Sequence, residues 1–84
     1  MLAVHLSDLH LTSKYRWFDR YCEVLNGLAR EWRDQGITEV FLTGDLSGRD
    51  APHRLTEPER LFLAQWLRAL SYYARVWIIP GNHD

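Results

Sequence analysis

Three short apolar runs alternate with two longer stretches in which apolar residues recur at helical spacing. The apolar runs cover residues 2–7, 38–43 and 75–80. From Phe18 to Asp34 apolar residues recur every three or four positions, the period of a helix with one apolar face. Strands that alternate with helices form parallel sheets. The sequence therefore predicts an α/β fold in the order β-α-β-α-β, with a mostly buried first strand.

The ends of the two helical stretches are marked by residues with well-understood roles. Gly36 follows the first stretch, and a glycine at this position commonly ends a helix. Thr56 and Glu59 have the spacing of a capping box. We therefore expect the second helix to begin after Thr56 and to run to about Tyr73.

Length and composition limit the classes of protein that this chain can represent. Its 84 residues form one compact unit at most, and 46% hydrophobic with 25% charged residues indicates a folded chain. The net charge of −1 argues against a basic arm that binds nucleic acid through charge alone. Cys22 is the only cysteine, which excludes a disulfide framework, and its place on the apolar face of the first helix predicts a buried thiol.

The sequence shows no signal for a membrane. No apolar run approaches the roughly 20 residues that cross a bilayer. The first residues lack the basic and apolar regions of a signal peptide. We therefore expect a cytoplasmic protein without a membrane partner.

Each predicted strand is followed by polar residues that suit a metal ion. These residues are Asp8 and His10 after the first strand, Asp45 after the second, and Asn82, His83 and Asp84 after the third. Sites in parallel sheets form at the carboxyl ends of the strands, so the three groups are expected to meet. Carboxylate, imidazole and carboxamide together suit Mn²⁺, Fe or Zn²⁺.

The three groups differ in how specific they are. Asp-x-His and Gly-Asp occur often by chance, and Gly-Asp commonly forms an ordinary turn. Gly-Asn-His-Asp at residues 81–84 is specific. The chance of finding all three in this order is on the order of one in a hundred thousand at average residue usage. Three unrelated polar turns are therefore a poor explanation.

These residues resemble the motifs of the calcineurin-like metallophosphoesterase family. The resemblance runs from Asp8-x-His10 through Gly44-Asp45 to Gly81-Asn82-His83-Asp84 and spans the chain. It implies that residues 1–84 form the N-terminal part of a single metallophosphoesterase domain. That part is a β-α-β-α-β portion of a four-layer α/β/β/α sandwich.

The resemblance implies two divalent metal ions, with manganese expected first and iron or zinc as alternatives. Asp8 and His10 would bind the first ion, and Asp45 would bridge both ions. Asn82 would bind the second ion through its carboxamide oxygen. The two ions would share a hydroxide that attacks the phosphorus atom of a phosphoester.

The resemblance assigns the last two residues to catalysis. His83 would face the substrate, stabilise the transition state and help to protonate the leaving group. Asp84 would orient His83 by accepting its other ring N–H.

The sequence departs from the family pattern after Asp84. Complete members continue with a lone histidine and a Gly-His-x-His motif, and His5 and His53 stand in the wrong places to replace them. His5 is instead expected in the core or on the surface of the sheet. We expect a piece of a longer enzyme, or a subunit that a partner completes, and we expect the 84 residues alone to be inactive. A catalytically incomplete remnant or a binding module is the alternative.

The substrate is left open between several phosphoesters, with a phosphodiester expected. Thr56, Glu59 and Arg60 resemble the helix start of DNA-repair exonucleases in this family, which suggests DNA as a substrate. Residues 7–11 are similar to the start of cyclic-nucleotide phosphodiesterases, so a small-molecule phosphodiesterase is an alternative. Residues 14–17 interleave basic and aromatic side chains, which would either contact a nucleic acid or lie solvated beside the first helix.

Overall fold

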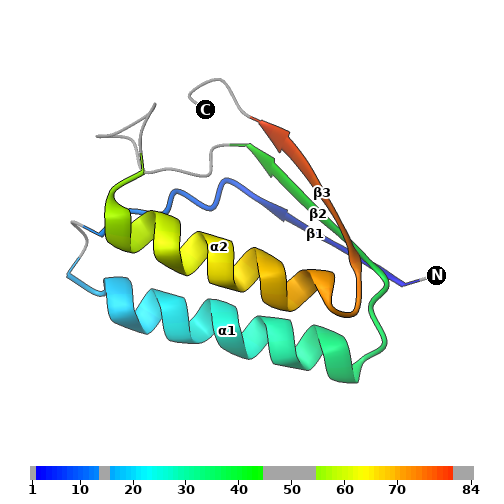
Figure 1. Cartoon of the computed structure of the whole chain (residues 1–84). Helices are drawn as coiled ribbons and strands as arrows, with labels where there is room; N and C mark the ends of the chain where they lie inside the picture. Colours follow the sequence, from blue (N-terminus) through cyan, green and yellow to red (C-terminus); the bar gives the residue numbers. More distant parts are fainter. Residues whose placement is uncertain (1, 14–15, 45–54, 81–84) are drawn as a thin grey trace.

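The computed structural model describes residues 2–13, 16–44 and 55–80, which form one parallel sheet and two helices (Figure 1). The elements in chain order are β1 (Ala3–Ser7), α1 (Phe18–Asp34), β2 (Glu39–Gly44), α2 (Glu57–Ser71) and β3 (Arg75–Pro80). The predicted α/β fold and its element order are therefore confirmed.

The sheet has the strand order β1-β2-β3, and both pairs of neighbouring strands are parallel. In the register, His5 lies beside Phe41, and Phe41 lies beside Trp77. The carboxyl ends of the strands and the first turns of both helices lie at the same end of the molecule (Figure 1). The carboxyl ends of the three strands therefore share this end of the molecule.

The core lies between the helices and one face of the sheet. Val40 and Leu42 of the central strand are fully or almost fully buried there, together with Leu25, Trp66 and Leu70 from the helices. The Trp66 indole N–H donates to the carbonyl oxygen of Leu25 at 2.7 Å, so its one polar group is paired inside the core. This packing joins α1 to α2 and holds both against the sheet.

The opposite face of the sheet is open in the described part of the chain. Exposed and half-buried residues alternate along β1, because only one side of the strand packs against the helices. The expectation of a mostly buried first strand was therefore wrong. His5 lies on the open face, where its Nε2 is 2.7 Å from Thr43 Oγ1, and Phe41 stacks on Trp77 with ring centroids 6.3 Å apart.

The ends of the helices follow the local sequence. The capping box is confirmed, because the Thr56 hydroxyl accepts from the Glu59 N–H and the Glu59 carboxylate accepts from the Thr56 N–H. Helix α2 ends at Ser71, two residues before the expected Tyr73, because the amides of the next residues donate back to the last turn. Gly36 follows α1 with a φ of 77°, as expected for a glycine that ends a helix.

Two further expectations concern the burial of the Cys22 thiol and the presence of a membrane-spanning helix. Cys22 is half-buried, so the expectation of a buried thiol was too strong. Burial, and then the nearby Asp19, raise the pKa of this thiol. Neither helix in the described residues has the length and apolar character needed to cross a membrane.

Candidate metal centre

Asp8 leaves β1 in an unusual backbone conformation. Its N–H still donates to the Thr43 carbonyl at 2.8 Å, as the next rung of the β1–β2 ladder. Its φ is 55°, and that of His10 is 48°, so both residues adopt the left-handed conformation. Residues other than glycine rarely adopt this conformation, and those that do are concentrated at functional sites. The two residues predicted to bind the first metal are therefore the two non-glycine residues with positive φ in the described chain.

The residues between and after them are anchored in the core. Leu9 and Leu11 are buried, whereas the side chains of Asp8 and His10 are partly exposed. The His10 Nε2 lies 3.9 Å from Asp8 Oδ1. Two buried leucines thus fix the loop, and the alternating residues bring a carboxylate and an imidazole together.

Gly44, the last residue of β2, makes room for Asp8. Its φ is 81°, and a Cβ atom at this position would lie 2.0 Å from Asp8 Oδ1 and 2.8 Å from Asp8 Cγ. No side chain fits there, so the Asp8 carboxylate is seated against the backbone of the central strand. A glycine at this position therefore relieves crowding beside Asp8. A carboxylate oxygen beside an imidazole nitrogen is a donor set that fits a divalent transition metal.

A tyrosine and a glutamate hold the loop of residues 8–13. The Tyr21 hydroxyl donates to the Leu9 carbonyl oxygen at 2.7 Å. Burial, and then the neighbouring Cys22, raise the pKa of Tyr21, which keeps the hydroxyl protonated as a donor. At the far end of the loop, both the N–H and the hydroxyl of Ser13 donate to Glu59 Oε2.

Glu59 is a buried carboxylate whose two oxygens both accept hydrogen bonds from protein donors. Only 2% of its surface is exposed. Its Oε1 accepts from the Thr56 N–H at 2.9 Å, while Oε2 accepts from Ser13. Burial alone would raise the pKa of Glu59, but the hydrogen bonds from Ser13 and Thr56 outweigh it and hold the pKa below its ordinary value. The carboxylate is therefore charged at neutral pH.

The other predicted site residues, Asp45, Asn82, His83 and Asp84, lie outside the described residues, as does His53. The strands that precede them end in register, because Gly44 pairs with Pro80. Within residues 2–13, 16–44 and 55–80, no group of three or more His, Cys, Asp or Glu side chains is placed to hold a metal. Of the predicted ligands, the described structure therefore brings together Asp8 and His10.

Sequence reasoning missed two residues that shape this site. Tyr21 is simply one of the apolar residues at helical spacing between Phe18 and Asp34, and Glu59 is part of the capping box and of the helix start that resembles DNA-repair exonucleases. The capping-box motif predicts the bond between Glu59 and Thr56. Nothing in the sequence indicates the bond between Glu59 and Ser13, which is 46 positions away.

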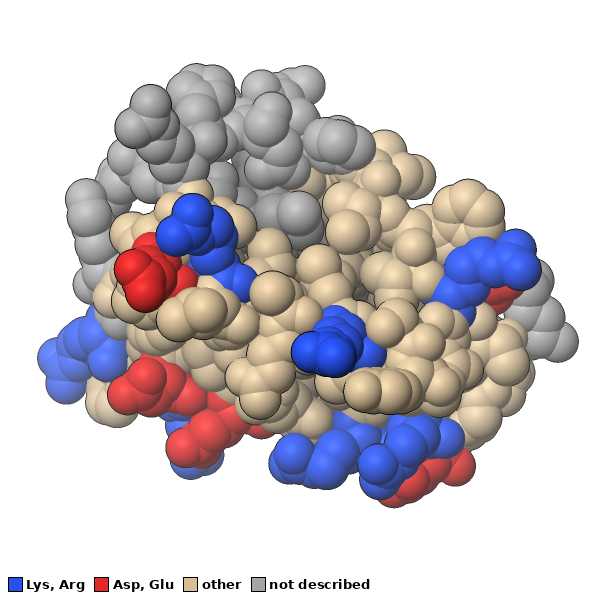
Figure 2. Space-filling view, viewed as in Figure 1, with Lys and Arg blue, Asp and Glu red and all other residues tan. Residues whose placement is uncertain are grey.

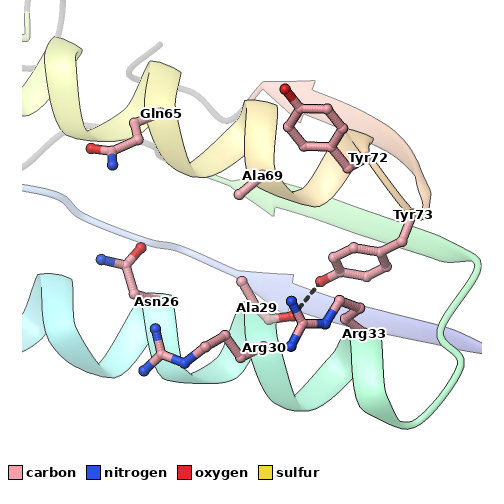
Figure 3. Close-up of a pocket in the computed structure, with 8 residues that line it drawn as sticks. All are labelled: Asn26, Ala29, Arg30, Arg33, Gln65, Ala69, Tyr72 and Tyr73. Atoms are coloured by element: carbon pink, nitrogen blue, oxygen red, sulfur yellow. Dashed lines mark hydrogen bonds between the residues drawn. The ribbon is translucent and has the colours of Figure 1, made fainter.

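The helices form a separate groove of about 510 Å³ on the outer side of the molecule (Figure 3). It is lined by Asn26, Ala29, Arg30, Arg33, Gln65, Ala69, Tyr72 and Tyr73. Tyr73 closes one end of the groove, with its hydroxyl donating to the Ala29 carbonyl at 2.7 Å. Arg33 lies in the last turn of α1, where a positive charge stabilises the carboxyl end of the helix, so its presence is explained without a ligand. The groove lies on the helices, away from the loop of Asp8 and His10.

Charges of both signs are mixed on the helical face. Figure 2 shows basic and acidic side chains side by side over the helices, with uncharged surface between them. Arg20 pairs with Glu23 at 3.8 Å, and Arg33 pairs with Asp34 at 3.3 Å. The described residues on this face therefore form no continuous basic surface for a nucleic acid.

Comparison with known families agrees with this geometry. The family model for calcineurin-like phosphoesterases matches residues 1–84. Because the match covers the whole chain, the chain belongs to the calcineurin-like phosphoesterase family. A search of curated proteins found no match. Members of this family hydrolyse phosphoesters and generally bind divalent metals, which places the chain among metal-dependent phosphoesterases.

Proposed function

We propose that residues 1–84 provide one side of a dinuclear metal site that hydrolyses phosphoesters, within a single metallophosphoesterase domain. Asp8 and His10 would hold the first ion, Asp45 would be shared by both ions, and Asn82 would hold the second. The remaining ligands come from further chain or from a partner subunit. Manganese is the expected metal.

One observation carries this proposal. Asp8 and His10 both adopt the left-handed backbone conformation, and the Asp8 carboxylate is seated where Gly44 leaves no side chain. An ordinary polar turn has no need for two such residues beside a glycine on another strand. A pair of ligands held in advance for a metal accounts for all three features.

The residues of the chain divide the work as follows. When bound, two divalent ions neutralise charge on the phosphate and lower the pKa of water. Asp8 and His10 supply oxygen and nitrogen ligands from one loop. His83 donates a proton from its imidazole to the leaving oxygen, and Asp84 accepts the other ring N–H to hold its orientation.

We further propose a phosphodiester, and specifically DNA, as the substrate. Arg16 and Trp17 lie at the start of α1, at the same end of the molecule as the carboxyl ends of the strands. The Arg16 guanidinium lies 4.6 Å from the centroid of the Trp17 ring, and Trp17 is 51% exposed. An exposed indole with a guanidinium on its face suits a base and its phosphate. Changing Lys14 and Arg16 together to alanine should weaken DNA binding and flatten its salt dependence, and unchanged values would contradict the proposal.

Hydrolysis by the natural gene product that carries this chain tests the proposed function. We expect Mn²⁺-dependent hydrolysis of bis(p-nitrophenyl) phosphate. Asp8→Asn should lower kcat/KM by more than the roughly 10–100-fold that changes around a metal ligand cause. Asp19→Asn, an exposed aspartate in the first turn of α1, is the matched control and should retain activity.

Thermal unfolding gives a second test that needs no substrate. Mn²⁺ should raise the melting temperature of the wild type, because an ion that binds only the folded state stabilises it. Asp45→Asn should reduce this rise. Equal behaviour of the two proteins would instead favour a non-catalytic binding module.

A further inference from the structure

Glu59 ties the loop after β1 to the first turn of α2. One of its oxygens accepts from the N–H and the hydroxyl of Ser13, and the other accepts from the N–H of Thr56. The Ser13 hydroxyl also lies 3.0 Å from Thr56 Oγ1. One buried carboxylate therefore joins two segments that are more than 40 positions apart in the chain.

Capping the helix does not by itself explain this arrangement. A capping box requires one carboxylate oxygen to accept from the N–H of the cap residue, which here is Thr56. That role leaves the second oxygen for solvent. In this chain the second oxygen receives both donors of Ser13, and the whole residue is buried. Burying a charge is unfavourable unless the charge is hydrogen-bonded. The capping role therefore does not explain why Glu59 is buried and bonded to Ser13.

The loop itself supplies that reason. Asp8 and His10 adopt a backbone conformation that non-glycine residues maintain only when the surroundings hold them. Leu9 and Leu11 hold the loop from the core side. Ser13, three residues after His10, is where the loop is held at its other end.

We propose that Glu59 is a positioning residue for the metal ligands. By holding Ser13, it keeps Asp8 and His10 in the left-handed conformations that bring the carboxylate and the imidazole together. The expected effect on metal binding rests on the proposed function, whereas the effect on the loop does not.

Glu59→Gln in the natural gene product tests this role. Glutamine keeps the size of the side chain but replaces one acceptor oxygen with an NH₂ group, which cannot accept a hydrogen bond. Either Ser13 or Thr56 then loses its acceptor. We expect Mn²⁺ affinity, measured by isothermal titration, to fall about tenfold. Amide hydrogen exchange over residues 9–13 should become faster.

Three further variants separate positioning from general stability. Leu70→Val removes a buried methylene near the other end of α2 and should leave Mn²⁺ affinity unchanged. Thr56→Ala removes the hydroxyl of the cap but leaves both Ser13 donors on Glu59, so it should also retain Mn²⁺ affinity. Ser13→Ala removes one bond to Glu59 and should give a smaller loss of affinity than Glu59→Gln, which provides a milder variant should Glu59→Gln unfold.

The outcomes distinguish this proposal from the proposed function. If the wild type binds Mn²⁺ and Glu59→Gln binds it equally well, the positioning role is overturned. If the Leu70→Val variant loses as much affinity as Glu59→Gln, the effect is one of stability and the role is again overturned. If the wild type binds no Mn²⁺, the proposed function fails, and the exchange of residues 9–13 alone decides whether Glu59 holds the loop.

Discussion

The two ends of the sheet use the same backbone conformation for different purposes. Gly36 leads into β2 at the amino end of the sheet, and Gly44 ends β2 at the carboxyl end, with φ values of 77° and 81°. A Cβ atom on Gly36 would meet nothing within 4 Å, whereas one on Gly44 would collide with Asp8. Gly36 serves only the turn after α1. Gly44 allows the close approach of Asp8.

The connections differ in the same way. At the amino end, backbone bonds close the chain: Ile37 N–H donates to the Trp32 carbonyl, and Ala74 N–H donates to the Leu70 carbonyl. At the carboxyl end, side chains from both helices hold the loop of residues 8–13, through Tyr21 and Glu59. The amino end therefore closes the fold, whereas the carboxyl end holds Asp8 and His10 in left-handed backbone conformations.

The largest expected difference between the two ends comes from alanine at the two glycines. Gly36→Ala should cost about 1 kcal/mol in the free energy of unfolding, because only the left-handed backbone is disfavoured. Gly44→Ala should cost about 2–3 kcal/mol, because the Asp8 carboxylate and its backbone must also move. Urea unfolding followed by circular dichroism measures both losses. Equal losses would show that the approach of Asp8 to Gly44 has no energetic consequence.

Acid unfolding gives the next largest effect. Hydrogen bonds hold the pKa of Glu59 below its unfolded value, so the stability it contributes is present above the ordinary glutamate pKa. This stability is lost as the pH falls through the lowered pKa of the folded state. Glu59→Gln should cost about 1–2 kcal/mol at neutral pH and flatten the loss of stability below about pH 4.5.

An exposed carboxylate at the amino end is the control for this measurement. Asp34 pairs with Arg33 on the surface at the end of α1, and such pairs contribute little to stability. Asp34→Asn should therefore retain the wild-type acid profile. A flattened profile in Asp34→Asn, or an unchanged one in Glu59→Gln, would contradict the special role of the buried carboxylate.

The smallest effect in stability is expected from a matched pair of tyrosines. Tyr21 and Tyr73 each donate one hydroxyl bond of 2.7 Å to a backbone carbonyl, of Leu9 and Ala29 respectively. Changing either to phenylalanine should cost about 1 kcal/mol. Only Tyr21→Phe should also weaken Mn²⁺ binding, because only Tyr21 holds the loop of Asp8 and His10. Equal Mn²⁺ affinities in the two variants would show that the Tyr21 bond contributes no more to Mn²⁺ binding than the Tyr73 bond.

Much of the fold follows from residues that are close in the chain. The helix from Phe18 to Asp34 has the bounds that its apolar spacing predicted, and β3 spans residues 75–80 as expected. The capping box of Thr56 and Glu59 formed, because its partners are three positions apart. Burial along β1 was predicted less well. It depends on which faces of the sheet the helices cover, and the strand itself does not encode this.

For the candidate site, too, sequence motifs and structure supply different information. Sequence motifs alone named Asp8, His10, Asp45, Asn82, His83 and Asp84, and the match to the calcineurin-like phosphoesterase family supports the class of chemistry they suggest. The roles of these six residues remain predictions. The structure adds how the first two are held in place.

The sequence by itself determined the order of the elements, the bounds of α1, the start of α2 and the resemblance to a phosphoesterase, because periodicity, capping and short motifs act over a few neighbouring residues. Only the tertiary structure decided that Gly44 faces Asp8 and that Ser13 bonds to Glu59. These partners are dozens of positions apart in the chain. They meet because parallel strands end at one edge of the sheet, and the first turn of α2 packs beside that edge.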